Sequence, residues 1–303
     1  MRITNNMMSY NFLGSLNKSL EKSVNIQAQL ADGKALHAPS DDPIKVVRSL
    51  RFSTSMELNN QYTQNAQDAL SWMGTSDDNM QNLSTIMISI KEQVGQAING
   101  TNPQTAVQAI GDAVDNLINQ MINIGNSQLG GRYIFAGQND KTVPIIRNAD
   151  DTITYNGDDQ KISMPIHPGI ANPSQDSVNL TGEGVFGPNM KILTDLIEIA
   201  NHLKSGTSVD QQWLTNTGLA NLDEGHTEML QSYTELGTRM SMYEMAKTML
   251  DNTNTIIAGD QATNDSIDVA KGIIDYKNSE NVYKTALQIG ARIMPMSLVD
   301  FLR

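Results

Sequence analysis

The chain has 303 residues, with 21 Lys and Arg against 33 Asp and Glu, and a formal net charge of −12. Because phosphate binding needs clustered Lys and Arg, this balance argues against a nucleic-acid-binding protein and against attachment to an anionic membrane surface. The sequence contains no cysteine, which excludes disulfides, thiolate nucleophiles and cysteine metal ligands. These totals favour a soluble protein.

The N-terminal sequence lacks the features of a cleaved secretory signal. No apolar stretch of roughly 7–15 residues and no small-residue cleavage site follow Met1. The sequence also has no run of about 18 apolar residues, so we expect no membrane insertion. If the protein leaves the cell, we expect a route that does not cleave its N-terminus.

Apolar residues recur with a seven-residue period near both ends of the chain. Such spacing predicts a helix that packs along one seam against a partner helix. The N-terminal seam consists of Leu13, Leu16, Leu20, Ser23, Gln27 and Leu30. The C-terminal seam consists of Val269, Ile273, Tyr276, Glu280, Tyr283, Leu287, Gly290 and Met294. Two such antiparallel ends could pair within one molecule.

The C-terminal segment carries a second apolar row beside this seam. The row consists of Val282, Ala286, Ile289 and Ile293. One partner helix covers one seam, so the second row needs another neighbour; at about 25 cal/mol per Å², leaving it in water forgoes several kcal/mol. We therefore expect both ends to be under-buried in a lone monomer and to become ordered among other copies.

Longer seams between the ends indicate long helices. They run over residues 69–97, 107–128 and 222–257. Between the first two, we expect Gly100 to close one helix, Asn102 to cap the next and Pro103 to occupy its first position. This arrangement predicts an αα-hairpin, and a further helix is expected near residues 189–202.

A strong helix start lies in the sequence APSDDP, at residues 38–43. Asp42 precedes a proline, which disfavours the α conformation, so we expect Asp42 as the N-cap and Pro43 as the first helical residue. One helix over residues 43–98 would be about 84 Å long. Its weakest point is Gly74, which costs roughly 1 kcal/mol relative to Ala. Residues 31–42 and 258–266 are the expected linkers.

The middle of the chain has the period of β-strands. Residues 152–155 and 162–166 alternate apolar and polar side chains, and Asn156-Gly157 between them is a strong hairpin signal. We therefore predict a β-rich insertion at 132–188 that interrupts the helical pattern.

The resulting fold class is mainly α: an elongated antiparallel coiled-coil helical rod with terminal helices and a β-rich insertion domain. The predicted segments are the N-terminal helix at 1–38, the first half of the rod at 39–131, the insertion at 132–188, the second half of the rod at 189–259 and the C-terminal helix at 260–303.

No arrangement of catalytic or metal-binding residues follows from the spacing. The histidines, His37, His167, His202 and His226, stand in unrelated segments without ligand spacing. The glycine pair at 130–131 and the sequence Gly-Glu-Gly at 182–184 lack the Lys-Ser/Thr of a phosphate-binding loop. We expect no catalytic residue, no metal and no cofactor, and therefore no enzyme.

Four stretches of the sequence resemble the bacterial flagellin family, and more closely its hook-associated protein 3 members. The first is MRITNNMMSYNFLGSLNKS at the N-terminus, similar to the family's assembly helix. The second is APSDDP at residues 38–43, which resembles the hook-associated form of the junction between linker and rod. The others are GGRYIFAGQ at 130–138 and RIMPMSLVDFLR at 292–303.

This resemblance implies a structural subunit of the bacterial flagellum, located outside the cell at the hook–filament junction. It implies export through the flagellar type III apparatus without signal cleavage. The implied partners are hook-associated protein 1, flagellin, other copies of the chain in a ring, and a cytoplasmic export chaperone.

The predicted mechanism is burial of the terminal helices between neighbouring subunits in an inner coiled-coil layer. The residues expected in this intersubunit packing are Phe12, Leu13, Leu16, Leu20, Tyr283, Leu287, Ile293 and Met294. Ser40, Asp42 and Pro43 are expected to fix the hinge. A flagellin filament subunit is the nearest alternative. An enzyme exported with the flagellum and a soluble coiled-coil binding module are further alternatives.

Overall fold

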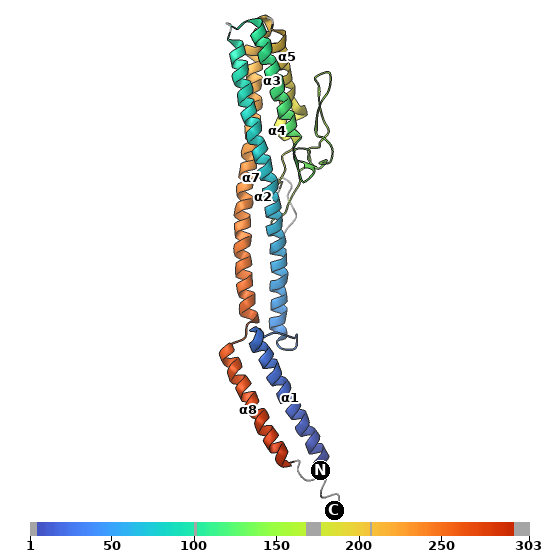
Figure 1. Cartoon of the computed structure of the whole chain (residues 1–303), viewed down its shortest axis with the longest axis vertical. Helices are drawn as coiled ribbons and strands as arrows, with labels where there is room; N and C mark the ends of the chain where they lie inside the picture. The colour runs from blue at the N-terminus through green and yellow to red at the C-terminus, as the bar shows by residue number, and fades with distance from the viewer. Residues whose placement is uncertain (1–4, 100–101, 168–176, 207, 294–303) are drawn as a thin grey trace, which may run out of the picture. The chain divides into compact units, whose positions relative to one another are not determined.

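The computed structural model describes residues 5–99, 102–167, 177–206 and 208–293 (Figure 1). The chain divides into two compact units. One consists of Met1–Leu58 and Thr253–Arg303, and the other is Asn59–Asn252. The predicted C-cap Gly100 and the predicted packing residue Met294 lie outside the described residues. No helix among the described residues combines the length and apolar character needed to cross a bilayer.

Helices dominate the structure, which confirms the mainly α fold class. The α-helices are α1 (Asn5–Asp32), α2 (Pro43–Ile98), α3 (Gln104–Gly125), α4 (Gly182–Phe186), α5 (Lys191–Ser205), α6 (Ser208–Trp213), α7 (Leu219–Asp265) and α8 (Val269–Ile293). A 3₁₀ turn at Pro188–Met190 precedes α5, and a π-helical turn at Leu214–Gly218 joins α6 to α7.

The long helix α2 is continuous from Pro43 to Ile98, as the sequence predicted. Met73, Ser76 and Met80 are buried on either side of Gly74. Packing of this seam against the neighbouring helices outweighs the roughly 1 kcal/mol that glycine costs in a helix. The start of α3 differs by one residue from the prediction, because Pro103 is the N-cap and Gln104 the first helical residue.

Helices α2, α3, α5 and α7 supply most of the core of the unit Asn59–Asn252. α3 and α5 lie beside the C-terminal half of α2 and the N-terminal part of α7 (Figure 1). A Cβ atom on Gly111 of α3 would lie 3.0 Å from Lys204 of α5, so the two helices pack at very close range there. The heptad seams predicted between residues 69 and 97 and between 107 and 121 supply many of the buried side chains: Ala69, Met73, Met80, Leu83, Met87, Ile90, Val94, Ala97, Val107, Val114 and Met121.

The described residues of the β-rich region form two small antiparallel hairpins. In the first, β1 (Gln128–Leu129) pairs with β2 (Arg132–Tyr133). Gly130 and Gly131 between them have φ of +60° and +80°, as a type I′ two-residue turn requires. In the second hairpin, β3 (Ile145–Arg147) pairs with β4 (Ile153–Tyr155), with Ile146 opposite Thr154.

The prediction of a hairpin with its turn at Asn156-Gly157 is wrong. The strand at 153–155 forms, but its partner is Ile145–Arg147, which precedes it. Gly157 instead lies against the ring of Tyr155, where an added Cβ would come within 2.4 Å of the ring carbon Cζ. The tyrosine hydroxyl donates to the carbonyl of Phe135 at 2.8 Å and accepts from the N–H of Gly182 at 3.1 Å. These non-local contacts override the local turn preference.

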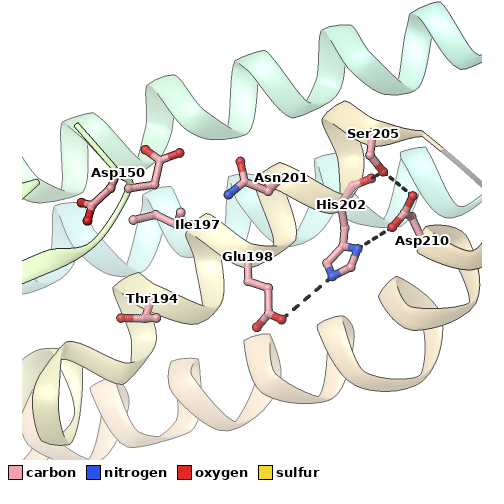
Figure 2. A pocket seen from close by; sticks show the side chains of 9 residues that line it. Asp150, Thr194, Ile197, Glu198, Asn201, His202, Ser205 and Asp210 are labelled. Carbon is pink, nitrogen blue, oxygen red and sulfur yellow. Dashed lines mark hydrogen bonds and ion pairs between the residues drawn. The ribbon is translucent and has the colours of Figure 1, made fainter. Parts of the chain in front are cut away.

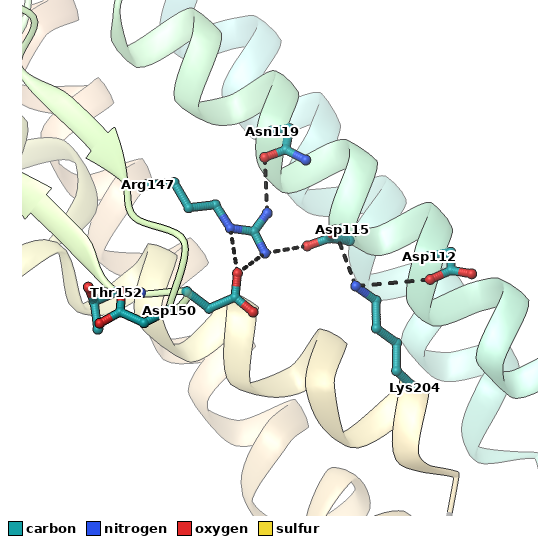
Figure 3. Close-up of polar contacts among 8 residues, drawn as sticks. Asp112, Asp115, Asn119, Arg147, Asp150, Thr152 and Lys204 are labelled. Carbon is teal, nitrogen blue, oxygen red and sulfur yellow. Dashed lines mark hydrogen bonds and ion pairs between the residues drawn. The ribbon is translucent and has the colours of Figure 1, made fainter.

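The inner side of the β-rich region belongs to the same core as the helices. Buried side chains from Ile134, Phe135, Ile145, Ile166 and Val178 join the helical core. A polar network reinforces this contact (Figure 3). Arg147 of β3 donates to Asp115 of α3 at 2.7 Å, to Asp151 at 2.7 Å and to Asn119 at 3.0 Å. Burial alone would raise the pKa of Asp115, but hydrogen bonds from Arg147 and Lys204 hold it below its ordinary value.

Candidate assembly interface

The terminal helices α1 and α8 pack against each other as an antiparallel pair. A Cβ atom on Gly272 would lie 2.8 Å from Leu30, and one on Gly290 would lie 2.5 Å from the ring of Phe12. Between these points the hydroxyl of Ser279 donates to the backbone carbonyl of Ser19 at 3.4 Å. The two glycines allow the larger side chains of α1 to approach the α8 backbone closely. The helical prediction for both ends is therefore confirmed.

The pairing leaves much of the apolar surface of both helices in solvent. Val282 and Ile289, from the predicted second row of α8, remain 60% and 48% exposed. Ala286 of the same row is half-buried, and the side chain of Ile293 lies outside the described residues. Because α1 covers only one seam of α8, the second row has no cover within the described residues of this unit.

The structure divides the predicted packing residues into two groups. Phe12, Leu16 and Tyr283 are half-buried, and Phe12 contacts α8 directly. Leu13, Leu20 and Leu287 are exposed. Further exposed apolar side chains lie outside the predicted packing set: Met7, Tyr10 and Val24 on α1 and Ile273, Ile274, Val282 and Ile289 on α8. Of these, Ile273 belongs to the predicted C-terminal seam, and Val282 and Ile289 belong to the predicted second row. Tyr10, Val24 and Ile274 lie in neither pattern.

The turn before α2 is held by aspartate side chains. Oδ1 of Asp42 accepts hydrogen bonds from the N–H groups of Ile44 and Lys45, both at 3.1 Å, as expected for an N-cap. Oδ2 of Asp41 accepts from the N–H groups of His37 at 2.9 Å and Ala38 at 2.8 Å. Ser40 lies exposed in the same turn. Asp41 was not among the predicted hinge residues, although its side chain bonds two N–H groups of this turn.

The segments that join the terminal helices to α2 and α7 are bonded to each other. Lys34 and Ser266 form an isolated antiparallel bridge. The N–H of Ala35 donates to the carbonyl of Asp265 at 2.7 Å, and that of Ile267 to Gly33 at 3.0 Å. We call this set, with Asp41 and Asp42, the linker clasp.

The predicted linker at 258–266 is too long, because α7 continues to Asp265. Helix-breaking residues such as Gly259 favoured a linker there. Side-chain contacts with α2 hold the last turns in place instead. Asn264 donates to the carbonyl of Lys45 at 3.0 Å, and Gln261 donates to the hydroxyl of Ser53 at 3.1 Å.

We predict that the stability of the linker clasp depends on pH through the carboxylate of Asp41. Hydrogen bonds from the N–H groups of Ala38 and His37 hold the pKa of Asp41 below its ordinary value of 3.8. A carboxylate with a lowered folded-state pKa stabilises the fold above its unfolded-state pKa, and that contribution is lost as the pH falls through the folded-state value. In ¹H–¹⁵N NMR spectra, we expect the amide signals of His37 and Ala38 to shift with a midpoint below pH 3.8.

The variant Asp41→Asn should remove this titration, because the amide cannot ionise. The matched variant Asp260→Asn, on an exposed part of α7, should leave the midpoint unchanged. A midpoint at or above 3.8 in the unaltered protein would contradict the role of Asp41 in the clasp.

An open pocket of about 470 Å³ lies in the unit Asn59–Asn252 (Figure 2). Nδ1 of His202 lies 2.6 Å from Asp210, and the histidine ring stacks on Trp213 with 4.0 Å between centroids. The hydroxyl of Ser205 donates to Asp210 and to the backbone carbonyl of His202, and not to the imidazole ring. A serine nucleophile needs a base within hydrogen-bond reach, so these three side chains do not form a catalytic triad. Their contacts join the end of α5 to α6.

Comparison with known proteins gives matches to flagellar proteins. A family model described as the bacterial flagellin N-terminal helical region matches residues 3–140. Flagellar hook-associated protein 3 of Escherichia coli strain K12 is 27% identical over 146 residues, which are 48% of this chain and 46% of that protein. Phase 1 flagellin of Salmonella naestved is 25% identical over 195 residues, which are 64% of this chain and 36% of that flagellin.

The fold also has a solved counterpart. The crystal structure of the flagellar junction protein of Legionella pneumophila matches with a TM-score of 0.60 at 15% identity, covering 72% of this chain and 99% of that chain. The present chain spans about half the length of the curated hook-associated relatives it matches.

Residues 3–140 are thus similar to the flagellin N-terminal helical region, and they belong to a mainly helical protein. The comparisons confirm the predicted resemblance to hook-associated protein 3 in sequence, and the chain shares the fold of the solved flagellar junction protein.

Proposed function

We propose that this protein is a structural subunit of the bacterial flagellum, acting as an adaptor at the hook–filament junction. Copies of the chain assemble by burying the terminal helices of neighbouring subunits against one another. The observation that carries the proposal is the apolar surface left open on paired terminal helices. Val282, Ile289 and Tyr10 stay largely exposed although α1 and α8 already contact each other.

The energetics support association through this surface. Fully burying a Val or Ile side chain is worth about 1.5–3 kcal/mol. The exposed side chains of α1 and α8 therefore provide enough apolar area for several favourable contacts with other helices. Assembly through helices from separate chains also explains why residues near both ends, far apart in sequence, are apolar on two faces.

The partners in this proposal are those expected from the resemblance of the sequence to hook-associated protein 3. One face of the assembled ring contacts hook-associated protein 1, and the other contacts flagellin. Before export the chain binds a cytoplasmic chaperone, and it leaves the cell through the flagellar type III apparatus without signal cleavage. The mature location is extracellular, and the role is mechanical, without catalysis.

We assign the predicted hinge, between the terminal helices and the rod, to the linker clasp. Asp42 and Pro43 begin α2, and Ser40 lies in the same turn. In the proposed assembly they set the boundary between the terminal helix and the rod, so that α1 and α2 form separate packing elements.

A flagellin filament subunit is the second candidate, favoured by the match of 195 residues to a flagellin. The location of the protein in the flagellum separates the two functions. The experiment is electron microscopy of cells in which an epitope in the exposed turn at Lys141–Thr142 is labelled with gold. An adaptor gives label at one point between hook and filament, whereas label along the whole filament would establish a flagellin. Cells that carry the untagged protein are the control.

A further inference from the structure

The Asn156-Gly157 pair, which does not form the predicted hairpin turn, brings together two groups that can react with each other. The side-chain carbon Cγ of Asn156 and the backbone nitrogen of Gly157 are joined through Cβ, Cα and the carbonyl carbon of Asn156. Attack of this nitrogen on Cγ therefore closes a succinimide ring without any rearrangement of distant segments. Glycine has no Cβ, so no side chain at position 157 obstructs the attack.

Neither of the two reacting groups is held in a hydrogen bond within the part of the chain that the structure describes. The side chain of Asn156 is exposed, and its amide has no hydrogen-bond partner there. The N–H of Gly157 likewise has no acceptor among those residues. Asn148 differs, because its side-chain amide donates to Thr152 at 2.8 Å and to Thr154 at 2.9 Å.

A neighbouring side chain polarises the peptide group between Asn156 and Gly157. Nδ2 of Asn139 donates a hydrogen bond to the backbone carbonyl oxygen of Asn156 at 2.7 Å. When the nitrogen of Gly157 loses its proton, the negative charge spreads onto this oxygen, and hydrogen bonds to ionised acceptors are stronger than those to neutral ones. A donor already placed on an oxygen that becomes negative lowers the barrier of that step. The N–H of Asn156 donates to the carbonyl of Pro144 at 2.8 Å, which holds the backbone in place.

We propose that Asn156 is a site of deamidation and that Asn139 accelerates the reaction by stabilising the deprotonated nitrogen of Gly157. Hydroxide takes the proton of the Gly157 N–H, and the nitrogen forms a bond to Cγ of Asn156. The side-chain nitrogen takes a proton from water and leaves as ammonia. Water then opens the succinimide at either carbonyl, which leaves aspartate or isoaspartate at position 156. The reaction needs only water and base, and it does not depend on the proposed flagellar function.

The test is incubation of the full-length protein at mildly alkaline pH, followed by tryptic digestion and mass spectrometry. Cleavage after Arg147 and after Lys161 gives one peptide that contains both Asn148 and Asn156. Electron-transfer fragmentation locates the mass gained when an amide becomes an acid, and it distinguishes aspartate from isoaspartate. We expect conversion at Asn156 that becomes faster as the pH rises, and no conversion at Asn148 over the same time.

The variant Asn139→Ala removes the donor from an exposed position and should leave the circular dichroism spectrum unchanged. It should slow the conversion of Asn156 by roughly tenfold in the folded protein. In concentrated urea, where the contact is lost, the variant and the unaltered chain should react at equal rates. The matched control is Gln138→Ala, which removes a neighbouring side chain that donates to the carbonyl of Lys161 at 3.1 Å and should leave the rate unchanged.

Three results would overturn the proposal. The first is an intact Asn156 after an incubation that converts Asn99, which belongs to the other Asn-Gly pair of the sequence. The second is an equal rate for N139A and the unaltered protein in the folded state. The third is a slowing by Q138A as large as that by N139A, because the effect would then come from the loop as a whole and not from the hydrogen bond to the Asn156 carbonyl.

Discussion

Replacing Val282 and Ile289 of α8 with aspartate is expected to abolish assembly while the monomer stays folded. Both side chains are exposed beside the α1–α8 seam, so the charges are solvated in the monomer. In the assembly they would be buried. Because the side chains are 60% and 48% exposed in the monomer, about half of the 1.5–3 kcal/mol for full burial of each is lost, which lowers the affinity by roughly 10–200-fold. Burying two unpaired carboxylates adds to that cost.

The measurement uses cells that lack the chromosomal copy and carry the variant. We expect the variant to be secreted into the medium in an unassembled form and to leave the cells non-motile. The matched control, Asn281→Asp/Gln288→Glu, adds the same charge on the face of α8 turned away from Gly272 and Gly290. Normal motility with V282D/I289D, at normal levels of protein, would show that the second row of α8 takes no part in assembly.

The substitution Phe186→Ala is expected to lower the free energy of unfolding by about 3–5 kcal/mol. Phe186 is fully buried at the end of α4. Its ring lies against Gly125 of α3, where an added Cβ would come within 3.1 Å, and Ile145 of β3 closes the same site from another side. Removing the ring therefore opens a cavity where a helix, a strand and the segment before α5 meet.

Chemical denaturation followed by circular dichroism measures this loss. The control Ile146→Ala removes a neighbouring side chain of β3 that is 40% exposed, and it should cost no more than about 1 kcal/mol. Equal effects of the two substitutions would contradict a core shared between the β-rich region and the helices. Such a result would favour the separate insertion domain predicted from the sequence.

The long helices could be predicted from the sequence because their signals are local and repeated. In α2, a heptad seam runs past Gly74 without a break, and Asp42-Pro43 marks the first turn. Both the heptad spacing and the helix start are recognised from a few residues that are close together in the sequence. The seams through which α1 and α8 pair were predicted from the same heptad spacing. Tyr10 is exposed on α1 but does not follow that spacing, so it was not predicted.

The β-rich region and the linkers could not be predicted in detail, because distant residues decide them. The ring of Tyr155 lies against both Gly157 and Gly182, and burial raises the pKa of its hydroxyl to about 12. No local pattern in Asn156-Gly157 reveals that contact. Similarly, the helical end of α7 depends on the contact of Asn264 with Lys45 of α2. Close approaches between distant segments, such as Gly111 to Lys204, are equally invisible in one sequence.

Hydrogen–deuterium exchange on the purified monomer and on the assembled flagellum shows whether the terminal helices become ordered by assembly. We expect fast exchange over residues 5–30 and 270–293 in the monomer, because a single helix pair with open apolar faces is only marginally stable. We expect strong protection of the same residues after assembly, while the core helices α3 and α5 are protected in both states. Strong protection of both terminal helices in the isolated monomer would show that they do not need neighbouring subunits to fold.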